Sequence, residues 1–131
     1  MTRAKYETKT LASVAALVSQ GDSFDRCLAN FLDEFYVAPS GAALAKVPAL
    51  LAPQFGELGH VQDAYLAATA EELARRFALS QPGWTAGETR QLHRPWFATP
   101  MAALRAVLLL ESPPGFRSRN LFVRENALTR A

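Results

Sequence analysis

The side chains best suited to chemistry in this sequence are arginines that stand among large aromatic residues in the C-terminal third. The candidates for contact with a partner are Arg94, Trp96, Arg105, Arg117, Arg119, Asn120 and Arg124. A guanidinium group presents a planar fork of N–H donors that matches phosphate or carboxylate oxygens, and nucleobases stack on aromatic rings. These residue types together predict a surface for an acidic protein, a phosphate group or RNA.

A structural role accounts for the same arginines without any partner. Pro113 and Pro114 must end a helix, because a proline ring cannot continue it and the preceding residue avoids helical angles. An arginine that follows could pair with Glu111 and hydrogen-bond the carbonyls left free at that helix end. Trp96 is likewise either a core anchor or a hot spot for a partner. The sequence leaves both interpretations open.

Other reactive residue types are sparse, so no catalytic, cofactor-binding or metal-binding residue is predicted. His60 and Asp63 stand one helical turn apart, but no second pair at a metal-binding spacing accompanies them. Cys27 is expected to be a small buried hydrophobe. The chain has no glycine-rich phosphate loop and no nucleophile motif. An enzyme would become the better interpretation if His93, Glu111 and Arg105 met in one deep pocket.

The composition predicts an all-α fold. Half of the 131 residues are apolar and a fifth are charged, as in an ordinary globular domain. Alanine and leucine supply 24 and 18 residues and isoleucine is missing, which favours helices over strands. The length suits one domain with one core. We therefore expect a single helical domain over 1–131, a compact bundle of about five helices with an irregular C-terminal arm, and a mobile tail over 1–9.

Charge and hydropathy indicate in which compartment the chain acts and what kind of partner it could bind. No apolar run approaches the roughly 20 residues that cross a bilayer, and Glu7 in the N-terminal segment argues against a signal peptide. The single Cys27 excludes an intramolecular disulfide and favours a reducing cytoplasm. Net charge is −2 over residues 1–65 and +4 over 66–131. This asymmetry permits an acidic partner but does not demand nucleic acid.

Apolar periodicity places most of the helices. Residues 10–20, 24–37 and 60–79 each carry apolar side chains at helical spacing, and short helical turns fit 42–46 and 48–52. The acid–arginine pairs Glu71–Arg75 and Glu72–Arg76 predict an exposed face on the 60–79 helix. The first two helices do not resemble a DNA-reading helix-turn-helix, because the second is acidic and aromatic.

The segment 99–111 is predicted to be the central helix of the domain. Thr99 can cap its start, Pro100 fits the first turn, and leucine at 108, 109 and 110 puts apolar side chains around the helix. The arm behind it is expected to fold back over this helix. Within the arm, residues 121–123 read as a short extended segment and 125–131 as a last helical turn.

The segments PWF at 95–97, LRAVLLLESP at 104–113 and FRSRNLFV at 116–123, followed by ENALTRA, resemble a group of uncharacterised bacterial proteins. Members of this group are also similar to the chain in the helix that contains DAYLAA at 63–68 and in the P-x-W loop at 82–84. The resemblance therefore covers about residues 60–131. It implies a setting beside toxin–antitoxin or regulator genes and brings no catalytic residues. Relatives with a helix-turn-helix ahead of this region differ from the present chain there.

These observations predict a protein-interaction or regulatory module, antitoxin-like, whose partner is another protein or a second copy of the chain. A nucleic-acid binder that uses the basic C-terminal edge is the first alternative, and an enzyme with an unrecognised site is the second. The salt dependence of binding distinguishes a protein-interaction module from a nucleic-acid binder, because affinity that depends on phosphate contacts falls steeply as the salt concentration rises. No cofactor and no membrane partner are predicted.

Overall fold

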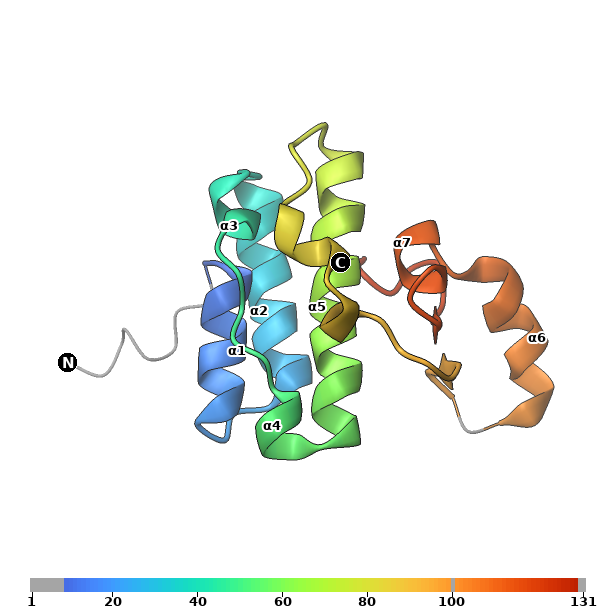
Figure 1. Cartoon of the computed structure of the whole chain (residues 1–131). Helices are drawn as coiled ribbons and strands as arrows, with labels where there is room; N and C mark the ends of the chain where they lie inside the picture. Colours follow the sequence, from blue (N-terminus) through green and yellow to red (C-terminus); the bar gives the residue numbers. More distant parts are fainter. Residues whose placement is uncertain (1–8, 100, 130–131) are drawn as a thin grey trace.

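The protein is all-α, as predicted from its composition. The computed structural model describes residues 9–99 and 101–129 (Figure 1). The predicted tail, apart from residue 9, and Pro100 lie outside these residues. In chain order the elements are α1 (Leu11–Ser19), α2 (Phe24–Val37), α3 (Ala42–Ala45), α4 (Ala52–Phe55), α5 (Glu57–Arg76), η2 (Gly83–Ala86), η3 (Glu88–Arg90), β1 (Trp96–Phe97), α6 (Ala102–Glu111), α7 (Pro114–Arg117) and β2 (Leu121–Phe122).

The first two helices begin and end where the sequence predicts, because local signals define both ends. The Thr10 hydroxyl accepts a hydrogen bond from the Ser13 N–H at 3.0 Å, and Ser23 caps α2 in the same way through the Arg26 N–H at 3.2 Å. Between the helices, Gly21 has a φ of 110°, which glycine adopts without strain. The apolar side chains at helical spacing on α2 are buried, including Phe31 and Phe35, except for Phe24, which is half-buried.

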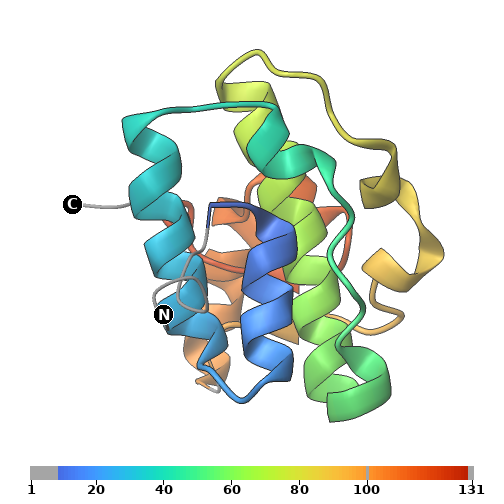
Figure 2. The same ribbon diagram turned by 90° about the vertical axis from the view of Figure 1, so that its left-hand side faces the viewer.

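Helix α5 is the central element of the domain. Between Asp63 and Ala74 every residue except Tyr65 and Glu71 is buried, so all sides of this part of the helix are covered. Figures 1 and 2 show α1 and α2 against one side of α5 and the C-terminal segments against the other. Alanines at 64, 67, 68 and 70 let these neighbours approach closely, and all four are fully buried.

Helix α6 lies at the edge of the molecule, so the prediction that residues 99–111 form its centre is wrong. The helix itself forms, yet Leu108 is the one large apolar side chain in it that is buried, at 2% exposure. Leu110 is 83% exposed and Leu109 46%. In Figure 1, α6 is the helix farthest from α1. Among the described elements, β2 makes the main contact with α6, so a mostly apolar helix leaves its outer side in solvent.

The arm behind α6 returns to the core. A two-residue parallel pairing joins β1 to β2, with Trp96 opposite Leu121 and Phe97 opposite Phe122. The predicted extended segment therefore exists. Of the helical turn predicted over 125–131, residues 125–128 form hydrogen-bonded turns instead, and residues 130 and 131 lie outside the described part of the chain. Leu128 is fully buried, and its carbonyl accepts a hydrogen bond from the Tyr36 hydroxyl at 2.7 Å.

One buried apolar cluster runs through the described residues, from Leu11 in α1 to Leu128 near the C-terminus. Phe116, Leu121 and Val123 of the arm belong to it together with residues of α1, α2 and α5. The arm is thus part of the same core as the helical bundle. None of the described helices combines the length and the apolar character that a membrane crossing requires.

Truncation of leucines in α5 and α6 tests which helix is central. Leu66→Ala removes a fully buried side chain, and we expect it to lower the free energy of unfolding by about 2–5 kcal/mol. Leu110→Ala should change it by less than about 0.5 kcal/mol, because Leu110 is already in solvent. Chemical denaturation of the two variants provides the measurement. A larger loss of unfolding free energy for Leu110→Ala than for Leu66→Ala would show that α6, and not α5, is the central helix.

Candidate functional site

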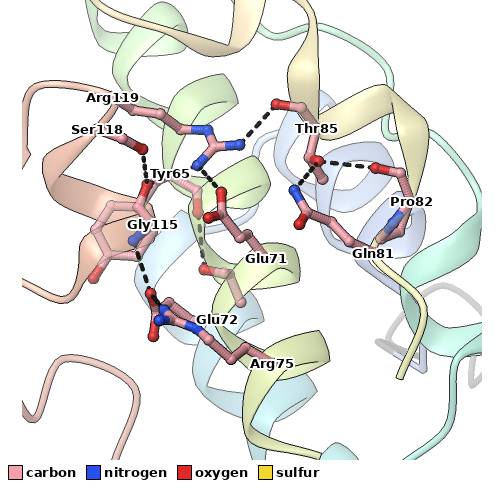
Figure 3. A network of polar contacts seen from close by, with 11 residues as sticks. Tyr65, Glu71, Glu72, Arg75, Gln81, Pro82, Thr85, Gly115, Ser118 and Arg119 are labelled. Atoms are coloured by element: carbon pink, nitrogen blue, oxygen red, sulfur yellow. Dashed lines mark hydrogen bonds and ion pairs between the residues drawn. The ribbon is translucent and has the colours of Figure 1, made fainter. Parts of the chain in front are cut away.

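Arg119 lies inside the protein and cannot contact a partner, which corrects its assignment to the binding surface. Its side chain is 4% exposed. One terminal nitrogen donates to the Gly115 carbonyl at 2.7 Å and lies 2.5 Å from Glu71 Oε1, and the other donates to the Thr85 carbonyl at 2.8 Å. Figure 3 shows these contacts converging from α5, α7 and η2. Arg119 therefore holds the C-terminal arm against the central helix.

Glu72 forms a second contact between α5 and the arm. Its carboxylate is buried, accepts a hydrogen bond from the Gly115 N–H at 2.8 Å, and pairs with Arg75 (Figure 3). A Cβ added at Gly115 would stand 3.0 Å from this carboxylate, so the close approach favours glycine. Glu71 and Glu72 thus face the arm, so the prediction that they lie on an exposed helix face is wrong for these two carboxylates. The predicted Glu72–Arg76 pair does form, at 3.8 Å.

Three further candidates make contacts within the protein, and two of them, those of Arg117 and Arg124, are the contacts expected of a structural role. Arg117 donates to the Ser112 carbonyl at 2.7 Å, at the end of α6 where the prolines follow. Arg124 lies 3.6 Å from Glu111. Asn120 has a φ of 64°, a conformation that asparagine tolerates better than most residues, and its amide donates to the Leu92 carbonyl at 2.8 Å. Arg117 and Arg124 nevertheless keep exposed surface, whereas Asn120 is half-buried.

A second internal arginine, Arg90, carries no signal in the sequence that marks it as buried. Its guanidinium is 3% exposed, lies 3.8 Å from Asp63 Oδ1, and donates to the Pro48 carbonyl at 2.5 Å. Asp63 also accepts hydrogen bonds from the Leu51 and Ala52 N–H groups at 2.7 and 3.1 Å. Burial raises the pKa of the Asp63 carboxyl against the opposing effect of these N–H groups and of Arg90, and burial lowers the pKa of Arg90.

The remaining candidates, Arg94, Trp96 and Arg105, are brought together around β1. They line one open hollow with Phe97, and the Arg105 guanidinium lies over the Phe97 ring, 4.9 Å from its centroid. Arg94 and Arg105 are exposed, while Trp96 is half-buried. Cation–π contact holds Arg105 beside the strand without neutralising its charge. Of the five predicted arginines, Arg94 and Arg105 are therefore the two that line this hollow, whereas Arg117 and Arg124 are exposed elsewhere.

Next to this hollow, α6 exposes apolar side chains to solvent. We call this the α6 face, and its residues are Met101, Leu104, Val107, Leu109 and Leu110. Half of the large apolar side chains that are exposed in the described residues belong to this face, although it spans only ten positions. Such a concentration is what distinguishes an interaction site from scattered exposed leucines. The signal in the sequence is a helix that is apolar on all sides, a pattern that fits a buried helix and a docking helix equally well.

The three side chains whose meeting would favour an enzyme, His93, Glu111 and Arg105, each contact a different residue. Glu111 pairs with Arg124, Arg105 packs on Phe97, and the His93 ring lies 6.4 Å from the ring of His60. Within the described residues, no group of three or more histidine, cysteine, aspartate or glutamate side chains is placed to hold a metal ion. Cys27 is buried, and burial raises the pKa of its thiol, which keeps the unreactive protonated form.

Comparison of the chain with family models, with curated proteins and with solved structures gives no match. A function must therefore be inferred from the geometry of the described residues.

Alanine substitution tests whether the buried Arg119 stabilises the fold and the exposed Arg94 does not. Arg119→Ala leaves Glu71 and two carbonyls without their guanidinium partner, and we expect a loss of about 3 kcal/mol in the free energy of unfolding. Arg94→Ala should stay within about 0.5 kcal/mol of the parent because its side chain is in solvent. Urea denaturation measures both values. Equal stability of the two variants would remove the structural role assigned to Arg119.

Proposed function

We propose that this chain is a protein-interaction module that binds its partner through the α6 face. The observation that carries the proposal is the exposure of the leucines in α6, above all Leu110 at 83%. A fully exposed leucine forgoes roughly 1.5–3 kcal/mol that burial would provide, and Leu110 comes closest to this limit. A partner that covers the face recovers this free energy. A stable helix that keeps such a face in solvent is typical of a docking element.

The geometry favours a partner with an apolar groove that receives α6 as a helix. Val107 and Leu110 are one turn apart, and Leu109 extends the face around the helix. The exposed Arg105 belongs to the same helix, and with the exposed Arg94 it lines the hollow at β1. Guanidinium groups at the rim of an apolar interface accelerate association with an acidic surface and select against basic ones. The expected partner groove is therefore apolar at its centre and acidic along one edge.

The positions of the other arginines make nucleic acid a weaker candidate. Arg119 points into the protein, Arg117 is hydrogen-bonded to the Ser112 carbonyl, and Arg124 pairs with Glu111. Affinity for a polyphosphate chain grows with the number of phosphates that are neutralised. The two exposed guanidinium groups of the hollow give only a small number of such contacts. An acidic protein surface can be bound with fewer such ionic contacts.

We propose further that the module acts in the bacterial cytoplasm as the regulatory, antitoxin-like member of a pair. Two observations support this finer proposal. The sequence pattern of residues 60–131 resembles bacterial proteins found near such pairs, and the single cysteine, Cys27, is buried and free, as suits a reducing compartment. Regulation would follow from occupancy of the partner's groove by α6.

The experiment places one charge on the α6 face and one on a matched exposed site. Leu110→Lys puts an ammonium group at the most exposed position of the α6 face, and Val37→Lys puts the same group at the end of α2, where the side chain is 86% exposed. Both variants should keep the parent melting temperature. We expect Leu110→Lys to weaken the complex at least tenfold, since a buried unpaired charge is costly, and Val37→Lys to bind as the parent does.

The partner is first captured from an extract of the source organism, then purified, and its affinity for each variant is measured by calorimetry at two salt concentrations. A shallow dependence on salt is expected for an apolar interface. Steep dependence on salt, with loss of binding on nuclease treatment, would indicate nucleic acid instead. Equal binding by Leu110→Lys and the parent would exclude the α6 face. Sedimentation of the purified chain alone shows whether the partner is a second copy.

A further inference from the structure

A groove between the helical bundle and the C-terminal arm is a second apolar surface of the molecule. It has a volume of about 750 Å³ and is lined by residues of α2, the first half of α5, β1 and the turns after β2. Its apolar wall includes Leu28 and Leu32 of α2 and Leu58 and Val61 of α5. Leu58 is 61% exposed, so the described part of the chain leaves this wall in solvent. An open apolar groove is the kind of surface that receives an amphipathic helix.

The groove and the α6 face lie next to each other on the same chain. Trp96 and Ala98 line both this groove and the β1 hollow, and Arg105 of α6 lines that hollow as well. At the end of α6, Glu111 lies 3.6 Å from Arg124, which lines the groove. The helix is thus connected to the groove near its start and at its end. A projecting apolar helix and an apolar groove therefore stand side by side.

The charges of the two surfaces are complementary. Asp25 belongs to the groove lining and Arg105 to α6, and neither forms an ion pair within the described residues. Arg124 is the other charged residue of the lining, and the group that it pairs with, Glu111, is the last residue of α6. An α6 helix of a second copy that enters the groove brings a guanidinium group for Asp25 and a carboxylate for Arg124. Such pairs fix the direction in which a helix docks.

We infer that the partner of the α6 face is a second copy of this chain, and that each copy inserts its α6 helix into the groove of the other. This inference rests on the proposed role of the α6 face and identifies the partner. Because the face and the groove adjoin, one two-fold axis places both helices in both grooves, which closes the assembly at two chains. Both apolar surfaces are then covered in a single interface.

Sedimentation of the full chain over a range of concentrations tests the state of assembly. We expect a dimer that dissociates on dilution, with no larger species. A monomer at every concentration up to the millimolar range would overturn the inference. A series of larger species would overturn it too, because a helix-in-groove contact that does not close on itself continues from chain to chain.

Two charge substitutions distinguish this dimer from one in which two α6 faces meet. Leu110→Lys alters the face and Leu58→Glu alters the groove, and both side chains are exposed, so both variants should keep the parent melting temperature. We expect each variant to dimerise at least tenfold more weakly than the parent, since either change buries an unpaired charge. Dimerisation of Leu58→Glu at the strength of the parent would overturn the inference.

Matched controls place the same charges on exposed valines outside both surfaces. Val37→Lys and Val47→Glu alter side chains that are 86% and 56% exposed. Both controls should dimerise as the parent does. A similar weakening by the controls would show that net charge alone governs association and would overturn the inference.

An equal mixture of Leu110→Lys and Leu58→Glu gives the sharpest test. In the mixed pair, the unaltered α6 face of one chain meets the unaltered groove of the other. The second junction brings the introduced ammonium group to the groove that holds the introduced carboxylate. We expect the mixed pair to associate at least tenfold more tightly than either variant with itself, as measured by sedimentation with one chain fluorescently labelled. No gain on mixing would overturn the inference.

The same variants separate this inference from the proposed function. A monomeric chain whose captured partner binds Leu58→Glu but not Leu110→Lys would show that the α6 face serves a different protein, and only the inference drawn here would fail. If Leu110→Lys alters neither dimerisation nor capture, the α6 face is not an interface and both proposals fail.

Discussion

The carboxylates of α5 impose the constraint on which the rest of the structure depends. A carboxylate that loses water must be paired or hydrogen-bonded, because an uncompensated buried charge costs several kcal/mol. Asp63 and Glu72 are buried and Glu71 is mostly buried. Each of the three receives donors from a segment far from it in sequence. The helix therefore determines where those segments lie, in addition to providing apolar surface for them.

Three irregular parts of the chain are positioned in this way. Asp63 accepts hydrogen bonds from the N–H groups at the start of α4 and pairs with the guanidinium of Arg90. Arg90 in turn donates to the Pro48 carbonyl. Glu71 binds Arg119, and Glu72 binds the Gly115 N–H group. Loops and turns that lack hydrogen bonds of their own thus obtain them from the central helix. The C-terminal arm is held closely enough to contribute Phe116 to the core, while α6, which precedes the arm, projects outward with its leucines exposed.

The elements that the sequence predicts correctly are those whose causes are local. Helices α1 and α2 lie where expected because their caps, the intervening Gly21 and the apolar period all act within a few residues. The contacts of Arg117 with Ser112 and of Arg124 with Glu111 are also predictable, since prolines at a helix end leave carbonyls free for nearby donors. For these parts of the fold and of the candidate surface, short-range signals in the sequence are sufficient.

The wrong predictions have one physical origin. Apolar content does not by itself imply burial, because burial depends on whether another segment is available to cover a helix, and α6 has few neighbours. Helix α5 looks peripheral in sequence because alanines and carboxylates fill it, yet its buried state depends on partners 48 positions away at Arg119 and 27 positions away at Arg90. The pattern of apolar and charged residues within a short stretch of sequence cannot identify such distant partners. For the same reason the sequence does not distinguish the buried Arg119 from a surface arginine, or the α6 face from a core helix.

Native-state hydrogen exchange tests the central claim most directly. The Leu51 and Gly115 N–H groups lie outside long helices, yet each donates to a buried carboxylate of α5. We predict that both exchange as slowly as amides at the middle of α5, near the free energy of global unfolding, and that amides of α6 such as Leu110 exchange through much smaller openings. Rapid exchange at Leu51 and Gly115, or protection in α6 equal to that in α5, would contradict the account.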